Sequence, residues 1–310
     1  MNVILLAPDF DLPDDWIHRV ELGSGPGVHI VLEHVIPDDD IQVAIVDNPQ
    51  PGRLARMRNL QVVFSLSAGI DSLIGDPLFP NVPIVRIIPS AMVSLMREYV
   101  CYHALRTHRG FAAIEALQNE RRWEWLAGSA PATEHDVVVL GLGALGAPTA
   151  QALSCLGFRT FGWSCHPRTI DGVTCLHGVE GLFGVLATVD ILVSVLPLTP
   201  STTNLICRDV FSKMPHGASL ISAGRGQCVN EGDLLDALDS DHLGSATLDV
   251  FAVEPLPEGH PLWSHSKVTI TPHMAAYPQA TSFVEPLAEQ LRRFVAGELQ
   301  LTKAYRERGY

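Results

Sequence analysis

Short apolar runs alternate with stretches of helical periodicity along the chain, a pattern typical of stacked β-α-β units with parallel strands. In the first third we expect buried strands separated by helices over Asp14–Leu22 and Arg53–Asn59, with proline and glycine at the joints. The predicted strands are Asn2–Ala7, Val43–Val46, Val62–Leu66 and Ile84–Ile88.

A second β-α-β series follows a long helical stretch, which we expect over Met96–Arg122 as one or two helices. The apolar spacing near the end of the chain predicts a last helix over Thr281–Gly297. The strands of the second series are predicted at Val137–Leu140, Arg159–Trp163, Ile191–Leu196, Ala218–Ser222, Ala246–Val250 and Val268–Thr271.

A chain of 310 residues exceeds what one compact core usually supports, so two domains are expected. We predict an α/β protein with two doubly wound parallel-sheet domains. Residues 1–98 and 276–310 would form a flavodoxin-like substrate domain, and residues 99–275 an inserted Rossmann cofactor domain. The active site is then expected in the cleft between the domains.

Composition narrows the classes of partner. The net charge of −13 argues against nucleic acid as a partner, whereas a few arginines can still form a pocket for a small anion.

No segment approaches the roughly 20 apolar residues that cross a bilayer, and the start of the chain lacks the basic residues of a signal peptide, so we expect a cytoplasmic protein. The six cysteines show no Cys-x-x-Cys pair or zinc-like spacing, and we predict no metal site.

A glycine-rich segment begins the second series: a strand runs into G-x-G-x-x-G and then into a helical pattern. Gly141 permits a tight turn, Gly143 lets a pyrophosphate approach the backbone, and Gly146 lets the helix pack closely on the strand. Three glycines alone also fit an ordinary turn, but the flanking strand and helix favour a dinucleotide site. Its predicted residues are Gly141, Leu142, Gly143, Ala144, Leu145 and Gly146.

The end of the next strand bears on which cofactor binds. A site specific for NAD places an acid about 20 residues beyond the glycines, to bond the ribose 2′-hydroxyl. Here Ser164 stands near that point, followed by His166 and Arg168. A hydroxyl and a guanidinium can hold a 2′-phosphate, so the segment favours NADP(H), with NAD(H) as the alternative. The sequence would be the same if Arg168 were only a solvent-exposed charge on a loop.

Three later segments carry polar groups directly after predicted strands, where open α/β sheets bind ligands. They contain Arg225 between two glycines, Glu254 before a proline, and His273 after a proline. Taken singly, each residue has an ordinary structural explanation as a surface cation, a strand-ending acid or a structural imidazole. The spaced set favours a catalytic site.

Further short motifs follow one order along nearly the whole chain. They are Ser67-Ala68-Gly69-Ile70-Asp71, Glu98-Tyr99-Val100, the glycine segment, Leu196-Pro197-Leu198-Thr199, Gly224-Arg225-Gly226, Asp249 to Pro257, Pro272-His273 and Arg306 to Tyr310. In these motifs and their order the chain resembles the D-2-hydroxyacid dehydrogenase family, and most of all its glyoxylate/hydroxypyruvate reductase branch.

The resemblance implies reduction of small anionic 2-oxo acids, such as glyoxylate and hydroxypyruvate, to 2-hydroxy acids with NAD(P)H. It assigns Arg225 to hold the substrate carboxylate and polarise its 2-oxo group, and His273 to donate the proton. Glu254 would bond the other imidazole nitrogen, and its negative charge is expected to raise the pKa of His273.

The resemblance also implies roles for other residues. The turn at Ala68, Gly69 and Ile70 is expected to hold the substrate carboxylate through backbone amides. We expect Asp249 to face the nicotinamide carboxamide, and a homodimer to form through the Met96–Arg122 helices. The stretch Ser90–Met96 either lines the substrate pocket or packs into the core as a methionine-rich helix entry. The expected cofactor wall consists of Leu196, Pro197, Ala223 and Gly224.

Alternatives stay open within the same fold. Asp47 stands where related reductases carry an aromatic residue, so a 2-hydroxyacid dehydrogenase for another acid, of lactate or phosphoglycerate type, is not excluded. Those relatives usually use NAD, with an acid at the position of Ser164, whereas a formate dehydrogenase would carry glutamine in place of Glu254. A nucleotide-sensing binding protein could share all these motifs, and only turnover separates it from an enzyme.

Overall fold

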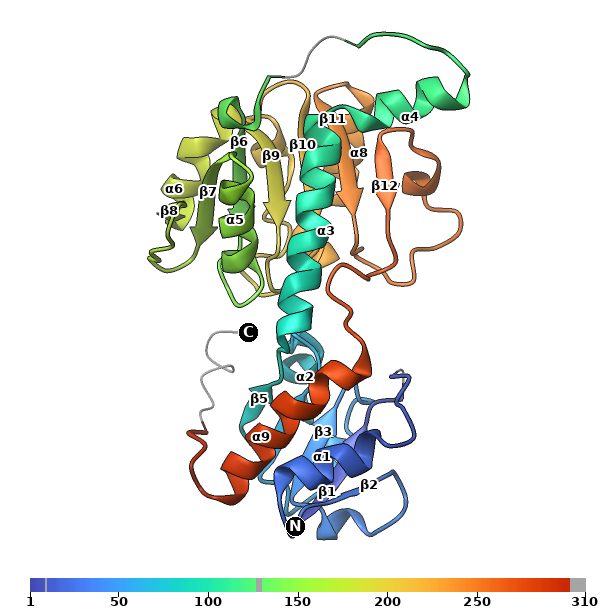
Figure 1. The fold of residues 1–310 in the computed structure, drawn as a ribbon, viewed down its shortest axis with the longest axis vertical. Helices are drawn as coiled ribbons and strands as arrows, with labels where there is room; N and C mark the ends of the chain where they lie inside the picture. The colour runs from blue at the N-terminus through green and yellow to red at the C-terminus, as the bar shows by residue number, and fades with distance from the viewer. Residues whose placement is uncertain (9, 127–129, 302–310) are drawn as a thin grey trace. The chain divides into compact units, whose positions relative to one another are not determined.

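The chain folds into two compact units (Figure 1), seen in a computed structural model that describes residues 1–8, 10–126 and 130–301. The first unit comprises Met1–Met92 and Pro278–Tyr310, and the second comprises Val93–Tyr277. The division therefore comes at 92/93 and 277/278, where the sequence led us to expect 98/99 and 275/276. Both units contain a parallel sheet, of five and seven strands, which confirms the predicted fold class.

The first unit has the strand order β2-β1-β3-β4-β5. The central strands β1, β3 and β4 are buried on both faces, as a parallel sheet covered on both sides requires. One face buries Ile4, Ala44 and Val63 in a common cluster. On the other face Phe64 meets Phe294 of the last helix, with ring centroids 6.3 Å apart. The elements are β1 (Asn2–Leu6), α1 (Trp16–Ser24), β2 (His29–Val31), β3 (Val43–Val46), β4 (Val62–Ser65), α2 (Asp71–Gly75), β5 (Ile84–Arg86) and α9 (Val284–Val295).

The second unit has the strand order β12-β11-β10-β9-β6-β7-β8. Helices α3 and α5 pack on one face of this sheet, while α6, α7 and α8 cover the other (Figure 1). Its strands are β6 (Asp136–Leu140), β7 (Arg159–Ser164), β8 (Thr174–His177), β9 (Val189–Ser194), β10 (Ala218–Ser222), β11 (Leu243–Leu248) and β12 (Val268–Ile270). Its helices are α3 (Ser90–His108), which begins in the first unit, α4 (Phe111–Asn119), α5 (Gly146–Cys155), α6 (Gly178–Val185), α7 (Arg208–Phe211) and α8 (Glu231–Asp239).

In the second unit β6 and β9 are neighbours, and the order in which the chain adds strands reverses between them: β7 and β8 lie on one side, and β10, β11 and β12 on the other. Open α/β sheets bind ligands at the carboxyl ends of the strands at such a reversal. The glycine segment follows β6, and Leu196 and Pro197 follow β9. The topology therefore brings two of the predicted cofactor segments to the same edge of the sheet.

The predicted helix over Arg53–Asn59 is wrong. Only the short 3-10 turn Leu54–Arg56 forms, followed by a second turn in which the N–H of Leu60 donates to the carbonyl of Met57 at 3.1 Å. Leu54, Met57 and Leu60 are buried at three-residue spacing. This spacing fits i→i+3 turns as well as an α-helix, and burial in the sheet core decided between them. The other 3-10 turns are Asp38–Asp40, Ala132–Glu134, Leu186–Thr188, Gly226–Cys228, Pro261–Ser264 and Ala280–Phe283.

Two edge strands, β2 and β8, were not predicted, because each is short and carries mixed polar and apolar residues. The long helical stretch forms as two helices, with a left-handed Gly110 (φ 64°) between them. Met92 and Met96 are buried, as the core-packing reading of Ser90–Met96 expects. No helix among the described residues combines the length and apolar character needed to cross a membrane.

Candidate active site

The glycine segment forms a cradle at the end of β6. Gly141 has φ +99°, a conformation that side chains disfavour, and a Cβ on Gly146 would lie 1.8 Å from the carbonyl oxygen of Gly141. A Cβ on Gly143, by contrast, would meet nothing within 4 Å. The space beside Gly143 is thus left open in front of the N-terminus of α5. This arrangement fits a pyrophosphate group, which would be held by the backbone N–H groups at the start of α5.

The predicted cofactor wall is tightly packed backbone. The N–H of Ala223 donates to the carbonyl of Ser194 at 2.9 Å, and a Cβ on Gly224 would lie 2.5 Å from the carbonyl oxygen of Leu196. Leu142, Leu196 and Ala223 are all buried. The side chain of Leu142 packs against Gly162, where an added Cβ would lie 2.7 Å from it, so Leu142 serves the core as well as the glycine turn.

Residues 164–170, at the end of β7 and directly after it, contain no acid. Ser164 Oγ donates to the carbonyl of His166 at 2.6 Å, which closes a short turn. His166 and Arg168 are exposed on this turn. The structure therefore leaves an imidazole and a guanidinium accessible where enzymes specific for NAD place a carboxylate.

The structure brings His273 and Glu254 together. His273 Nδ1 lies 2.7 Å from Glu254 Oε2, and the other oxygen, Oε1, accepts the N–H of Phe251 at 2.9 Å. Because an ionised carboxylate can only accept, Nδ1 carries a proton in this pair. The imidazole side chain is 49% exposed, so Nε2 is left for an incoming molecule. The pair has the geometry of a general acid supported by a carboxylate.

Arg225 follows β10 in an extended conformation and is half-buried. Its Nη1 donates to the carbonyl of Gly224 at 3.0 Å. A Cβ on Gly226 would lie 1.9 Å from the carbonyl carbon of Phe251, so glycine lets the Arg225 loop pack directly on the loop that carries Glu254. Gln227 Nε2 donates to the carbonyl of Ala252 at 2.9 Å and joins the same two loops.

Asp249 is buried beneath the His273 turn. Its carboxylate accepts from Thr271 Oγ1 at 2.6 Å, from the N–H of Met274 at 2.9 Å and from the N–H of Ala275 at 2.9 Å. The structure thus shows Asp249 in contact with the residues around His273. Its expected contact with a nicotinamide carboxamide stays a prediction.

Ala68, Gly69 and Ile70 lie between β4 and α2 in the first unit, whereas Arg225, Glu254 and His273 lie in the second. Arg86 Nη1 donates to the carbonyl of Ala68 at 3.2 Å, a contact that the sequence did not reveal because Arg86 ends a different strand. The shared cleft, and the grip of this turn on a substrate, stay predictions.

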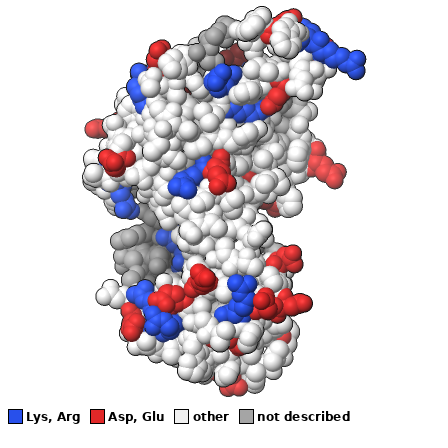
Figure 2. Space-filling view, viewed as in Figure 1, with Lys and Arg blue, Asp and Glu red and all other residues white. Residues whose placement is uncertain are grey.

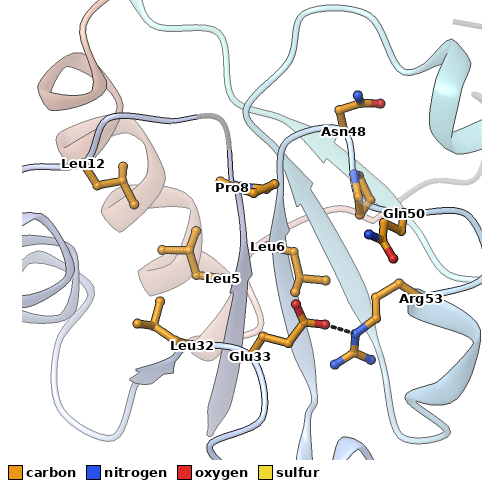
Figure 3. A pocket seen from close by; sticks show the side chains of 11 residues that line it. Leu5, Leu6, Pro8, Leu12, Leu32, Glu33, Asn48, Gln50 and Arg53 are labelled. Atoms are coloured by element: carbon orange, nitrogen blue, oxygen red, sulfur yellow. Dashed lines mark hydrogen bonds and ion pairs between the residues drawn. The ribbon is translucent and has the colours of Figure 1, made fainter.

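Asp47, which departs from the related reductases, accepts a short hydrogen bond from Ser67 Oγ within the first unit. This contact ties the end of β3 to the turn that follows β4. A cavity of about 400 Å³ lies in the same unit, at the carboxyl ends of β1 and β3 (Figure 3). Leu5, Leu12 and Leu32 form its apolar wall, and Glu33 and Arg53 pair at its edge.

Comparison with known proteins decides the family. Residues 101–275 match the model of the D-isomer specific 2-hydroxyacid dehydrogenase, NAD binding domain. The chain belongs to this family. It is 33% identical over 309 residues to glyoxylate/hydroxypyruvate reductase A of Serratia proteamaculans (strain 568), covering 96% of each chain.

Solved structures of the family superpose on the whole chain. A D-isomer specific 2-hydroxyacid dehydrogenase from Xanthobacter autotrophicus Py2, in complex with NADPH and MES, is 36% identical with a TM-score of 0.92, over 100% of this chain and 99% of that one. An NADPH-dependent glyoxylate/hydroxypyruvate reductase from Sinorhizobium meliloti, in complex with NADP and sulfate, is 32% identical with a TM-score of 0.86 and the same coverage. The protein is thus an NAD(P)-dependent 2-hydroxyacid dehydrogenase that resembles the glyoxylate/hydroxypyruvate reductases.

Proposed function

We propose that this protein reduces small 2-oxo acids, with glyoxylate and hydroxypyruvate as first candidates, to the corresponding 2-hydroxy acids. The observation that carries the proposal is the His273–Glu254 pair, with Nδ1 and Oε2 2.7 Å apart, on loops that pack beside the Arg225 loop. The relatives named as glyoxylate/hydroxypyruvate reductases support the choice of substrate class.

In the proposed mechanism the bound nicotinamide supplies the hydride that adds to the carbonyl carbon of the 2-oxo acid. Arg225 binds the substrate carboxylate with its forked guanidinium and draws electron density toward the 2-oxo oxygen. His273 transfers the proton on Nε2 to that oxygen as the carbon–oxygen double bond becomes single. Glu254, 2.7 Å from Nδ1, stabilises the imidazolium that is present before the transfer.

We further propose that NADPH is the preferred reductant. The turn after β7 presents exposed His166 and Arg168 and contains no carboxylate, and relatives were crystallised with NADPH or NADP. A charged hydrogen bond contributes about 1.5–3 kcal/mol, so Arg168→Ala should lower kcat/KM for NADPH by roughly 10- to 100-fold. The same variant should leave kcat/KM for NADH nearly unchanged. Equal effects on both cofactors would contradict this assignment.

A homodimer through α3 and α4 stays part of the proposal. Leu105, Phe111 and Ile114 are exposed along these helices, and Trp123 and Trp125 that follow are 93% and 91% exposed. Exposed apolar clusters of this kind commonly mark contacts between proteins. Sedimentation equilibrium of the wild type and of Trp123→Ser/Trp125→Ser would show whether the association exists and uses this surface. A cytoplasmic location also stays a prediction.

Basic and acidic side chains are interspersed on the face of the molecule shown in Figure 2. Because the net charge is −13, we expect positive potential for an anionic substrate to arise locally, from individual cations such as Arg225 and from backbone N–H groups.

A panel of 2-oxo acids tests the proposed function directly. Purified protein would be given glyoxylate, hydroxypyruvate, pyruvate and phosphohydroxypyruvate, each with NADPH and with NADH, and cofactor oxidation would be followed by absorbance. We expect turnover of glyoxylate or hydroxypyruvate with NADPH as the fastest combination. Fastest turnover of another acid would reassign the substrate. Cofactor binding without turnover of any acid would favour the nucleotide-sensing alternative.

A further inference from the structure

A chain of hydrogen bonds joins helix α3 to the turn that carries His273. Tyr99 Oη lies 2.7 Å from Thr271 Oγ1, and Thr271 Oγ1 donates to Asp249 Oδ1 at 2.6 Å. The carboxylate can only accept, so the single hydroxyl proton of Thr271 points to Asp249. Tyr99 must therefore donate to Thr271, and the chain runs in one direction from the tyrosine to the carboxylate.

Asp249 holds three consecutive residues of the His273 turn. Its backbone carbonyl accepts the N–H of His273 at 2.8 Å, and its two carboxylate oxygens accept the N–H groups of Met274 and Ala275 at 2.9 Å each. Asp249 is only 1% exposed, so these bonds form away from water, where hydrogen bonds to an ionised group are strong. The position of the turn is thus set by Asp249.

The turn requires such support because its backbone is strained. His273 has φ 53°, in the left-handed region that residues with a side chain rarely adopt. Its imidazole is half exposed, so few packing contacts fix the ring, and Glu254 restrains only the Nδ1 side. Loss of one bond to Asp249 would let the backbone relax and change the direction of Nε2.

Tyr99 is itself held in one place. It lies in the cluster formed by α3 and the sheet, and its ring packs on His103, one helical turn further along, with centroids 4.5 Å apart. Burial raises the pKa of the Tyr99 hydroxyl, so the group keeps its proton and remains a donor over the whole physiological range.

We propose that Tyr99 is a positioning residue for the proton transfer: through Thr271 and Asp249 its hydroxyl holds the His273 turn so that Nε2 meets the substrate carbonyl. The inference rests on the proposed role of His273 as proton donor. It adds a residue that lies 172 positions from Thr271 in the sequence, on a different element, and that acts through Thr271 and Asp249.

Tyr99→Phe tests the proposal, because it removes one oxygen and keeps the ring packed on His103. Misplacement of a reacting group by about 1 Å can cost on the order of 100-fold in rate, so we expect kcat with NADPH and hydroxypyruvate to fall by roughly 5- to 100-fold. The KM for NADPH and the thermal midpoint should change little. Tyr102→Phe, the same substitution at an exposed position of α3, is the matched control and should retain the wild-type rate.

Thr271 provides a second, independent variant. Thr271→Val removes the hydroxyl and keeps the shape, and it should lower kcat to a similar extent, while Thr271→Ser should restore most of the rate. The double variant Tyr99→Phe/Thr271→Val should be no worse than Thr271→Val alone, because both remove the same chain of bonds. With deuterated NADPH, the isotope effect on kcat should rise in the impaired variants as the reduction step becomes slower.

The outcomes separate the two proposals. If the wild type reduces no 2-oxo acid, the proposed function fails. If the wild type is active and Tyr99→Phe and Thr271→Val both match Tyr102→Phe, the positioning role fails. The positioning role would also be overturned if the fall in kcat came together with a similar fold-loss of NADPH affinity or with a marked fall in the thermal midpoint. A general structural role would then explain the data.

Discussion

His273 and Glu254 form a pair in which the carboxylate of Glu254 is held from two sides. Nδ1 of the imidazole lies 2.7 Å from Oε2, while Oε1 of the same carboxylate accepts the N–H of Phe251 at 2.9 Å. The carboxylate therefore cannot rotate away without breaking its hydrogen bond to the N–H of Phe251. The pair lies on two loops that follow β11 and β12, and the pairing of these neighbouring strands brings the loops together.

Removal of the proton donor should abolish most of the activity. His273→Gln is expected to lower kcat by about 10² to 10⁴, the usual contribution of general acid catalysis, with NADPH affinity retained. Glu254→Gln should also lower kcat, because a neutral amide no longer stabilises the imidazolium. Steady-state rates with hydroxypyruvate and NADPH binding by fluorescence would measure both effects.

His265 offers a matched control for the His273 variant. Its Nε2 lies 3.4 Å from Asp239 Oδ1, so it is another histidine paired with a carboxylate in the second unit. His265→Gln should turn over at close to the wild-type rate. A wild-type rate for His273→Gln would remove the proposed donor.

Arg225 should act through the geometry of its guanidinium as well as its charge. Arg225→Lys keeps the charge but loses the fork that matches a carboxylate, so we expect kcat/KM for the 2-oxo acid to fall by roughly 10- to 100-fold, and further in Arg225→Ala. Cofactor affinity should be unaffected by either change. If Arg225→Lys kept the wild-type kcat/KM, a single positive charge would be enough to bind the carboxylate. The proposed contact through two guanidinium N–H groups would then be wrong.

Gly143 and Gly146 should respond to alanine in opposite ways. A Cβ on Gly143 enters open space, so Gly143→Ala should fold normally and weaken NADPH binding by about tenfold or more, because the methyl group occupies the space left for the pyrophosphate. A Cβ on Gly146 would lie 1.8 Å from the carbonyl oxygen of Gly141, so Gly146→Ala should lower the free energy of unfolding by about 1–3 kcal/mol. Thermal melts and NADPH titrations distinguish the two. If the two variants lost thermal stability to the same extent, the space beside Gly143 would not be open.

His103 should make the protein less stable in mild acid. Burial lowers its pKa from 6.5 to about 4, with Arg106 acting in the same direction and Asp249 opposing. Between these two values the unfolded chain binds a proton that the folded chain does not. The stabilisation is therefore complete above pH 6.5 and is lost progressively as the pH falls toward 4, at up to about 1.4 kcal/mol per pH unit.

The pH dependence of the free energy of unfolding would measure this contribution. In His103→Gln the difference between neutral pH and pH 4 should be smaller than in the wild type. Parallel curves for the two proteins would show that His103 does not titrate on unfolding.

Local sequence patterns determined much of this protein. Alternating apolar runs and helical stretches predicted the β-α-β order, since a parallel strand must be buried on both faces and a helix must cover it. The glycine spacing predicted the turn at Gly141 and the open space at Gly143, because both follow from backbone sterics within one short segment. The family resemblance brought Arg225, Glu254 and His273 forward as a set.

Tertiary structure decided the features that depend on residues far apart in the chain. Whether residues 53–59 form a helix depended on how Leu54, Met57 and Leu60 pack in the core, and the edge strands β2 and β8 exist only because β1 and β7 pair with them. The contacts of Arg86 with Ala68, and of Tyr99 with Thr271, join elements whose separation in sequence carries no signal. A hydrogen bond depends on position in space to within a fraction of an ångström, and only the folded chain provides that.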